Sequence, residues 1–436
     1  MTSRDKQGAD SLESPRAAPA AAENGNQGLV EPDLDFIRSL SRRGGESLKK
    51  CFQCGTCSGT CALSPDKKPF PRKEMAWALW GMKERLVRDP DIWLCYQCND
   101  CSTVCPRDAR PGDVLAAIRQ ESVVHYAVPR FLARWVSQPC CIPLLLGIPA
   151  ALLTGVLLLK VPLENVLGIS SPSGERIVYS YSSMLPHWLL NGFFGLLSFL
   201  VLLVVVAGVV RFWREMEAAA VRDGIAAPAK GLFASIVAAL RSIFTHEKFT
   251  MCTKTYSRSF AHLSVLFGFL ALCLVTIWVI TARYNPLIQD AFIYPFSFWN
   301  PWKILANLGG AAIAGGCLWM IMDRLRNSGQ AGAATYPDWA LIVTLLVVVI
   351  TGLIAEVLHY VRLDSYRHVA YFIHLVFVCA LLMYLPYCRF AHMVYRTTAM
   401  VFAEYYGLGS VAEPAPAAQS ENLDRKEDDH AEEGSR

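Results

Sequence analysis

The chain has 436 residues, of which 53% are hydrophobic, and a mean hydropathy of +0.30. Charged residues make up only 18%, below the soluble average of about a quarter, which argues against an ordinary soluble enzyme and indicates a membrane protein. The formal net charge of +4 is small and spread along the chain, so nothing indicates a nucleic-acid partner.

The two ends of the chain differ in composition from the part between them. Residues 1–30 are polar, contain no apolar stretch typical of a secretory signal, and are expected to be a disordered tail in the cytoplasm. Residues 411–436 form a charged tail that is also expected to be disordered. A cysteine-bearing domain over 31–125 and an apolar domain over 138–400 remain.

Two cysteine runs share the spacing C-x2-C-x2-C-x3-C, at residues 51–61 and 95–105. In a reducing cytoplasm such repeats indicate metal binding more often than disulfides. Zinc is the other metal to consider, but it gives no reason for a fourth cysteine at the same offset in both runs. In two-cluster ferredoxins that fourth cysteine ligates the other cluster. We therefore expect two [4Fe–4S] clusters with crossed ligands: Cys51, Cys54, Cys57 and Cys105 for one, and Cys95, Cys98, Cys101 and Cys61 for the other.

Helical patterns surround the second run. The stretch PRKEMAWALWGMKERLV (71–87) spaces Met75, Leu79, Met82 and Leu86 along one helical face, and RPGDVLAAIRQESVV (110–124) also predicts a helix. Together with the cysteines, this arrangement resembles the α-helical ferredoxin of heterodisulfide reductase small subunits and of succinate dehydrogenase iron–sulfur subunits.

Six apolar stretches are long enough to cross a bilayer core of about 30 Å. The sequence therefore predicts an all-α protein in which the ferredoxin domain precedes six transmembrane helices, near 140–160, 187–210, 259–281, 303–322, 339–360 and 368–390. Between the second and third spans, residues 211–258 carry eight Lys or Arg, which by the positive-inside rule places both termini in the cytoplasm. We expect a multi-pass protein of the cell inner membrane.

Two histidines of the last span indicate haem. Ionisable residues inside a membrane are costly and usually functional. His374 and His392 are eighteen residues apart, which on a continuous helix is five turns and about 27 Å along one face. Such a helix can serve one haem in each leaflet, although Pro386 between them favours a kink.

Each haem needs a second imidazole at the same depth. His262, at the start of the third span, is the expected partner of His392, while His187 and His359 are alternative partners of His374. Glu356, Arg362 and Asp364 lie close to His359 in the sequence and are candidates for carrying protons to a quinone, or a solvated group of loop charges.

The last five spans resemble the cytochrome b subunit of respiratory nitrate reductase. In that family a histidine early in one span pairs with the later of two histidines eighteen residues apart, with a proline between those two; His262, His374, Pro386 and His392 match. Leu272 stands where the family has its fourth ligand, so the second haem takes its ligand from another helix or is missing.

A helical ferredoxin fused to such a cytochrome b resembles the membrane subunit of quinone-interacting membrane-bound oxidoreductase (Qmo) complexes of sulfur-metabolising bacteria. That family resembles a fusion of the C and E subunits of heterodisulfide reductase. The resemblance implies partner subunits with flavin and iron–sulfur clusters, electron exchange with adenylylsulfate reductase, and menaquinone or ubiquinone as substrate. The chain would then be a quinone-interacting oxidoreductase subunit that passes electrons through its clusters and haem b and has no catalytic residue for a soluble substrate of its own.

Two alternatives remain open. A heterodisulfide-reductase-like carrier would use the same cofactors with another soluble partner. A haem-free anchor would merely attach an iron–sulfur module to the lipid bilayer, and the spacing of His374 and His392 argues against it.

Overall fold

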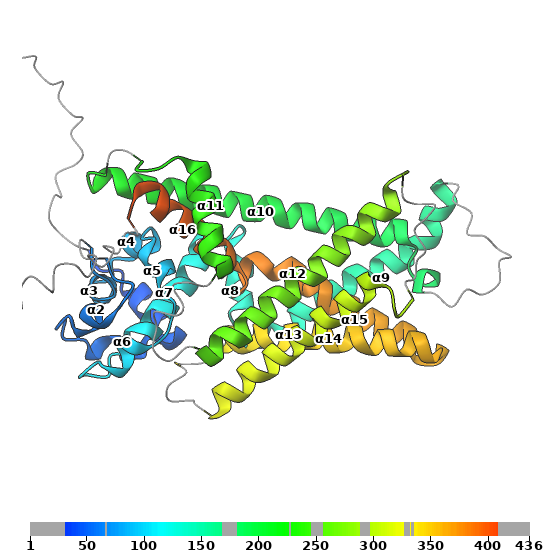
Figure 1. Cartoon of the computed structure of the whole chain (residues 1–436), viewed down its shortest axis with the longest axis horizontal. Helices are drawn as coiled ribbons and strands as arrows, with labels where there is room; N and C mark the ends of the chain where they lie inside the picture. The colour runs from blue at the N-terminus through cyan, green and yellow to red at the C-terminus, as the bar shows by residue number, and fades with distance from the viewer. Residues whose placement is uncertain are drawn as a thin grey trace, which may run out of the picture.

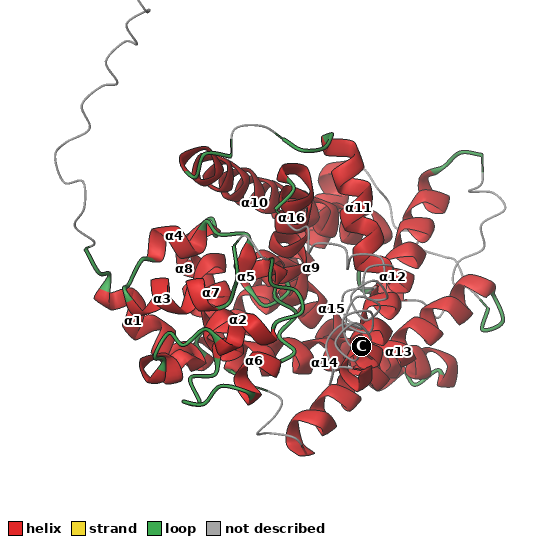
Figure 2. Cartoon of the chain, turned by 60° about the vertical axis from the view of Figure 1, so that its left-hand side comes forward, coloured by secondary structure: helices red, strands yellow, loops and turns green. Residues whose placement is uncertain are grey.

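The structure, a computed structural model, describes residues 31–65, 68–167, 181–225, 228–245, 256–287, 297–326, 332 and 335–408. The two predicted tails lie outside these residues. Within them every regular element is a helix, as Figure 2 shows, which confirms the all-α prediction.

The two cysteine runs lie in a group of short helices at one end of the molecule (Figure 1). The longest, α7 (Pro111–Tyr126), is buried along most of its length and forms the centre of this cysteine domain. Around it lie α1 (Leu34–Leu40), α2 (Thr56–Thr60), α3 (Arg72–Leu79), α4 (Lys83–Val87), α5 (Asp91–Leu94) and α6 (Asp100–Thr103).

The helix expected over 71–87 is divided, so that prediction was wrong in one respect. Gly81 separates α3 from α4 and has a φ of +64°, which side chains other than glycine rarely adopt. A Cβ at Gly81 would lie 2.7 Å from the backbone nitrogen of Asp33, just before α1. The turn therefore lets the chain pass directly against the start of α1.

Within the described residues, six helical segments are long and apolar enough to cross a membrane, which confirms the predicted number of spans. Within a bilayer a helix satisfies its own backbone hydrogen bonds, so apolar runs of this length fold as spans. They are α9 (Ile142–Leu167), α10 (His187–Arg222), α12 (Tyr256–Tyr284), α13 (Pro301–Arg326), α14 (Tyr336–Val361) and the last segment, α15 (Asp364–Tyr384) with α16 (Ala391–Tyr406). A shorter helix, α8 (Arg130–Val136), precedes them, and α11 (Leu232–Thr245) packs beside α16.

The last span is broken between its two histidines. Helix α15 ends at Tyr384, a short turn follows over Leu385–Tyr387, and Cys388 is extended before α16 begins. Proline lacks a backbone N–H and its ring clashes with the preceding turn, so Pro386 accounts for the break. His374 and His392 therefore lie on two helices, and the five-turn relation expected for one continuous helix does not hold.

The cysteine domain and the membrane helices share one hydrophobic core. Helix α10 has 36 residues, about 54 Å, and is longer than a bilayer core requires. Its last turns bring Phe212 within 5.0 Å of the Tyr126 ring of α7, while Tyr395 of α16 stacks on Trp93 of α5 at 5.5 Å. Figure 1 shows the same ends of α10 and α16 beside the cysteine domain. The cysteine domain is thus packed onto these helices and not merely tethered to them.

Candidate cofactor sites

The two cysteine runs fold in the same way. Gln53 and Gln97, each just before the second cysteine of its run, both have positive φ, and so do Gly55 and Asn99 after it. Alternating left-handed residues turn successive backbone N–H groups toward one side, which is how chains form anion-binding nests around iron–sulfur clusters. A short helix, α2 or α6, then carries the third cysteine of each run.

The first run and the last cysteine of the second run meet in one pocket. Its lining includes the thiols of Cys51, Cys54, Cys57 and Cys105, the four residues expected to hold the first cluster. The Ala109 backbone N–H donates to Cys105 Sγ at 3.3 Å, as backbone amides do around cluster sulfurs. Burial raises the pKa of Cys57 to about 11, so its thiolate needs a positive partner such as iron.

The other four cysteines form a second group. Cys61 lies close enough to Cys95 and Cys98 for their charges to interact, and Cys101 interacts with all three. Burial raises the pKa of Cys61 to about 11. The charge of Cys57 also acts on Cys101, which shows that the two groups are neighbours. The eight thiols therefore lie close together, and their division into the two crossed sets stays a prediction.

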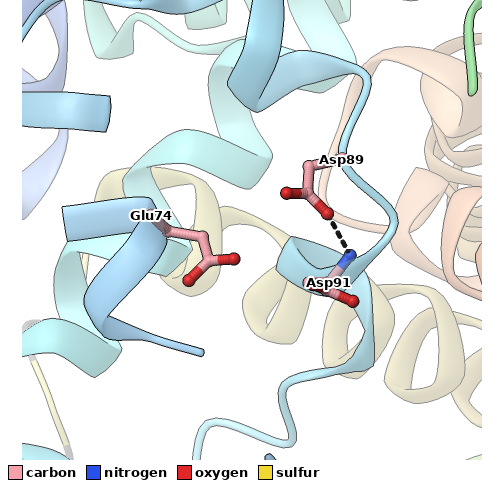
Figure 3. Close-up of side chains that lie close together, drawn as sticks. All are labelled: Glu74, Asp89 and Asp91. Atoms are coloured by element: carbon pink, nitrogen blue, oxygen red, sulfur yellow. Dashed lines mark hydrogen bonds between the residues drawn. The ribbon is translucent and has the colours of Figure 1, made fainter. Parts of the chain in front are cut away.

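Three buried carboxylates form another cluster that has the residue types of a metal site. Figure 3 shows Glu74, Asp89 and Asp91 turned toward one another. The ammonium of Lys73 already fills their centre, 3.2 Å from Glu74, 2.7 Å from Asp89 and 2.6 Å from Asp91. A divalent cation would be repelled at these distances, so the group is an internal ion cluster of the fold. The sequence pattern missed it, because the four residues meet only after folding.

His262 and His392 come together as expected. Phe269, two helical turns after His262 on the same face of α12, lies 5.1 Å from the Phe390 ring beside α16. His262 is exposed and near enough to His392 for their charges to interact. The Nδ1 atom of His392 is hydrogen-bonded to the Arg389 carbonyl oxygen at 2.5 Å. Because a carbonyl can only accept, Nδ1 carries the proton, and Nε2 is left to bind a metal. That His262 and His392 hold a haem between them stays a prediction.

His374 is oriented in the same manner on α15. Its Nδ1 lies 3.1 Å from the Val348 carbonyl of α14, which again leaves Nε2 for a metal. A Cβ at Gly352 would lie 3.0 Å from the imidazole, so the glycine lets the ring rest closely on α14. The ring therefore has the tautomer that haem ligation requires.

The two candidate partners of His374 are His359 and His187, and both lie toward the ends of the spans that are far from the cysteine domain. His359 is seven residues beyond Gly352, about 10 Å along α14, with its ring 5.8 Å from that of Tyr181. His187 begins α10 and lies near Arg283. The pairing of His374 with either residue stays a prediction.

The candidates for carrying protons lie nearby. Glu356 accepts a hydrogen bond from Asn307 at 3.1 Å and forms an ion pair with Lys303 at 2.9 Å. The side chain of Asp364 lies outside the described residues.

The second thiol group lies against the helix that carries His392. Arg396 of α16 donates to the Cys95 carbonyl at 2.9 Å, and Arg119 of α7 donates to the same oxygen at 3.0 Å. A pocket between the cysteine domain and the membrane helices is lined by Trp93, Arg119, Arg389 and His392 among others. No sequence motif marks these arginines, and their contacts with the Cys95 loop follow only from the fold.

Two family models match the chain and divide it at the same place as the fold. A model of the 4Fe-4S dicluster domain family matches residues 47–109. A model of the Citrate utilization protein B family matches residues 137–406, more than half of the chain. The chain belongs to the Citrate utilization protein B family.

The relatives fall into two groups, one that matches most of the chain and one that matches about a quarter of it. Citrate utilization protein B of Escherichia coli is 27% identical over 395 residues, which cover 86% of this chain and 92% of that protein. The C subunit of the H(2):CoB-CoM heterodisulfide,ferredoxin reductase of Methanothermobacter marburgensis is 34% identical over 110 residues, 23% of this chain and 59% of that subunit. A protein of Archaeoglobus profundus that is like the C subunit of heterodisulfide reductase is 36% identical over 108 residues, 24% of this chain and 56% of that protein.

This member of the Citrate utilization protein B family thus spans a little over half the length of the heterodisulfide reductase subunits that it matches. No solved structure gives a significant match. The likeness identifies the cysteine domain as a 4Fe-4S electron-transfer domain of the kind found in the C subunits of heterodisulfide reductases. The six apolar helices make the chain a multi-pass membrane protein.

Proposed function

We propose that the chain is the membrane subunit of a redox complex and carries electrons between a soluble flavin and iron–sulfur partner and the quinone pool. The path runs from the first cluster to the second, then to a haem b held by His262 and His392. A second haem on His374 leads to menaquinone or ubiquinone. The protein contributes ligands, spacing and a low dielectric, and the cofactors carry the electrons.

The observation that carries this proposal is the order of the sites in space. The pocket of the first thiol group is lined by Cys51, Cys54, Cys57 and Cys105. Phe52 also lines it, and this side chain is 68% exposed. The second thiol group adjoins the first and is bonded through the Cys95 carbonyl to Arg396, one turn from His392. This succession supports an entry point for a soluble partner and an exit into the membrane.

Two classes of soluble partner are compatible with this path. The resemblance to Qmo membrane subunits favours a partner linked to adenylylsulfate reductase. The likeness to Citrate utilization protein B extends over 86% of the chain and favours a soluble partner that takes part in the use of citrate. The second class rests on the larger part of the chain, and we prefer it. If the clusters exchanged electrons with adenylylsulfate reductase, and not with a partner that acts on citrate, that preference would be reversed.

The proposed location is the cell inner membrane, with the cysteine domain and the C-terminus in the cytoplasm. The eight basic residues of 211–258 support this orientation. A cytoplasmic cysteine domain also keeps the thiols in the compartment where clusters are assembled.

The test is an optical spectrum of the purified membrane protein, oxidised and then reduced by a quinol, with iron and haem quantified. We expect about eight cluster irons and b-type haem bands that a quinol reduces. Two haems per chain would support ligation by both His374 and His392, while one would leave the pair His262 and His392. Cluster iron without haem would reject the proposal and leave an iron–sulfur anchor.

A further inference from the structure

Two arginines converge on the loop that carries Cys95. Arg119 lies in α7 and is only 7% exposed. Its Nη1 donates to the carbonyls of Cys95 at 3.0 Å and Ile92 at 3.2 Å, and its Nη2 donates to Gln97 Oε1 at 2.9 Å. The guanidinium thus binds the backbone just before and at the first cysteine of the second run.

Arg396 reaches the same loop from the membrane side. Its Nη1 donates to the Cys95 carbonyl at 2.9 Å, and its guanidinium lies over the Tyr96 ring, 4.0 Å from the ring centre. Its Nη2 is buried and makes no hydrogen bond to the described part of the chain. Arg396 follows His392 by four residues, so both lie on one face of α16, about 6 Å apart along the axis.

These two guanidiniums differ in their charge balance from three partly buried arginines of the fold. Arg389 pairs with Asp338 at 2.6 Å, Arg43 with Glu121 at 2.5 Å and Arg110 with Asp113 at 2.6 Å. Among the ion pairs of the described residues, neither Arg119 nor Arg396 has a carboxylate partner. The groups that accept their hydrogen bonds are neutral, and a buried cation without an anion is costly.

The adjacent thiol group supplies the missing negative charge. A [4Fe–4S] cluster with four thiolates has a net charge of −2 when oxidised and −3 after it accepts one electron. We propose that Arg119 and Arg396 are the counter-charges of the second cluster, which make it easier to reduce and hold its loop against the helix of His392. This inference rests on the proposed function. Both are positioning residues: the cysteines of the second group would hold the cluster, which would supply one-electron transfer, and the arginines would act on it only through their charge.

The charges of Arg119 and Arg396 affect the reduction potential of the second cluster. Attraction between the arginines and the cluster grows when the cluster gains its electron, so the reduced state is favoured more than the oxidised state. Because Arg119 belongs to the cysteine domain and Arg396 to α16, the same two contacts fix the second cluster relative to His392.

The experiment is a redox titration of the full-length protein, followed by low-temperature electron paramagnetic resonance. A Cys98→Ala variant first identifies the signal of the second cluster by removing it. In Arg396→Gln we expect the ratio of reduced to oxidised second cluster, at fixed ambient potential, to fall about tenfold, equivalent to a shift of about 59 mV for one electron. The first cluster should keep its potential, and Arg396→Lys, which retains the charge, should shift the second cluster less than Arg396→Gln.

Arg211→Gln is the matched control, because Arg211 also lies over a tyrosine ring, 6.0 Å from the centre of Tyr126. It should leave both cluster potentials unchanged. Arg119→Gln should act like Arg396→Gln; if it fails to assemble clusters, the Arg396 variants still decide. Equal potentials in wild type and Arg396→Gln would overturn the inference, and so would a shift confined to the haem, since Arg396 would then serve the haem. A wild-type protein without a second cluster signal would instead contradict the proposed function.

Discussion

Three carboxylates around one ammonium leave the surroundings of Lys73 with excess negative charge. Burial raises the pKa of Glu74 to about 8, against the opposing effect of Lys73. The folded state therefore holds a proton that the unfolded chain, with an ordinary pKa of 4.5, releases at lower pH. The contribution of Glu74 to the free energy of unfolding is fully present below about pH 4.5 and is lost as the pH rises toward 8. Asp91, whose pKa burial raises to about 6, adds to the lower part of this range.

Glu74→Gln should remove most of that loss. We expect the wild type to be less stable at pH 8.5 than at pH 6 by on the order of a few kcal/mol, and the variant to show a much smaller difference. The measurement is the temperature at which cluster absorbance is lost at both pH values. Glu84→Gln, at an exposed carboxylate that pairs with Arg88, is the control and should follow the wild type. Parallel curves for Glu74→Gln and the wild type would contradict the predicted proton.

The crossed assignment of cysteines makes a second prediction for single residues. Cys54→Ala and Cys105→Ala should remove the same electron paramagnetic resonance signal, because both thiols line one pocket. Cys61→Ala and Cys98→Ala should remove the other signal. Each variant should retain about four of about eight irons. If Cys105→Ala and Cys98→Ala instead removed the same signal, the ligands would be local to each run.

At the scale of elements, helices α12 and α13 are held together by glycines. A Cβ at Gly316 of α13 would lie 2.7 Å from Val265 Cγ2 and 2.8 Å from the carbonyl of Ala261, the residue before His262. Small residues let membrane helices approach closely in this way, and overpacking costs about 1–3 kcal/mol. Gly316→Ala should therefore displace the turn that carries His262.

We expect Gly316→Ala to retain its cluster iron and to lose a substantial part of its haem. Gly315→Ala is the matched control, since a Cβ there meets no atom of the described residues within 4 Å. The ratio of haem to cluster iron in the two purified variants is the measurement. Equal haem in both would show that the α12–α13 contact does not position His262.

The same elements show what could be predicted from the sequence. The six spans and the two cysteine runs were predictable, because the length of an apolar run and the spacing of thiols are local properties. The break at Pro386 was foreseen only as a kink, since a proline does not reveal how far the chain departs from the helix. The turn at Gly81 depends on contact with Asp33, far away in the chain. Arg119 and Arg396 acquire their roles only when α7 and α16 meet at Cys95.

At the scale of the whole molecule, the two thiol groups face different surroundings. The second adjoins α16 through the bond from Arg396 to the Cys95 carbonyl, where Trp93 and Tyr395 belong to one shared core. The first lies beside exposed Phe52, and the guanidinium of Arg107 lies 4.1 Å from the centre of that ring. The proposed soluble partner would therefore have access to the first thiol group. The exposed Arg72 and Arg107 in the lining of its pocket favour an acidic partner surface.

The positive charges of Arg72 and Arg107, which form a positive rim around the pocket of the first thiol group, should act on small charged oxidants as they would on a partner. With the clusters reduced by dithionite, Arg107→Glu should slow reoxidation of the first cluster by ferricyanide, an anion, and speed reoxidation by hexaammineruthenium(III), a cation. The two effects should be several-fold at low ionic strength and fade at high salt, because screening shortens the reach of surface charges. Lys160→Glu, near the far end of α9, changes the net charge equally and should alter neither rate. Equal ferricyanide rates in Arg107→Glu and Lys160→Glu at low salt would mean that the first cluster is not approached across this rim, and the docking face would have to lie elsewhere on the cysteine domain.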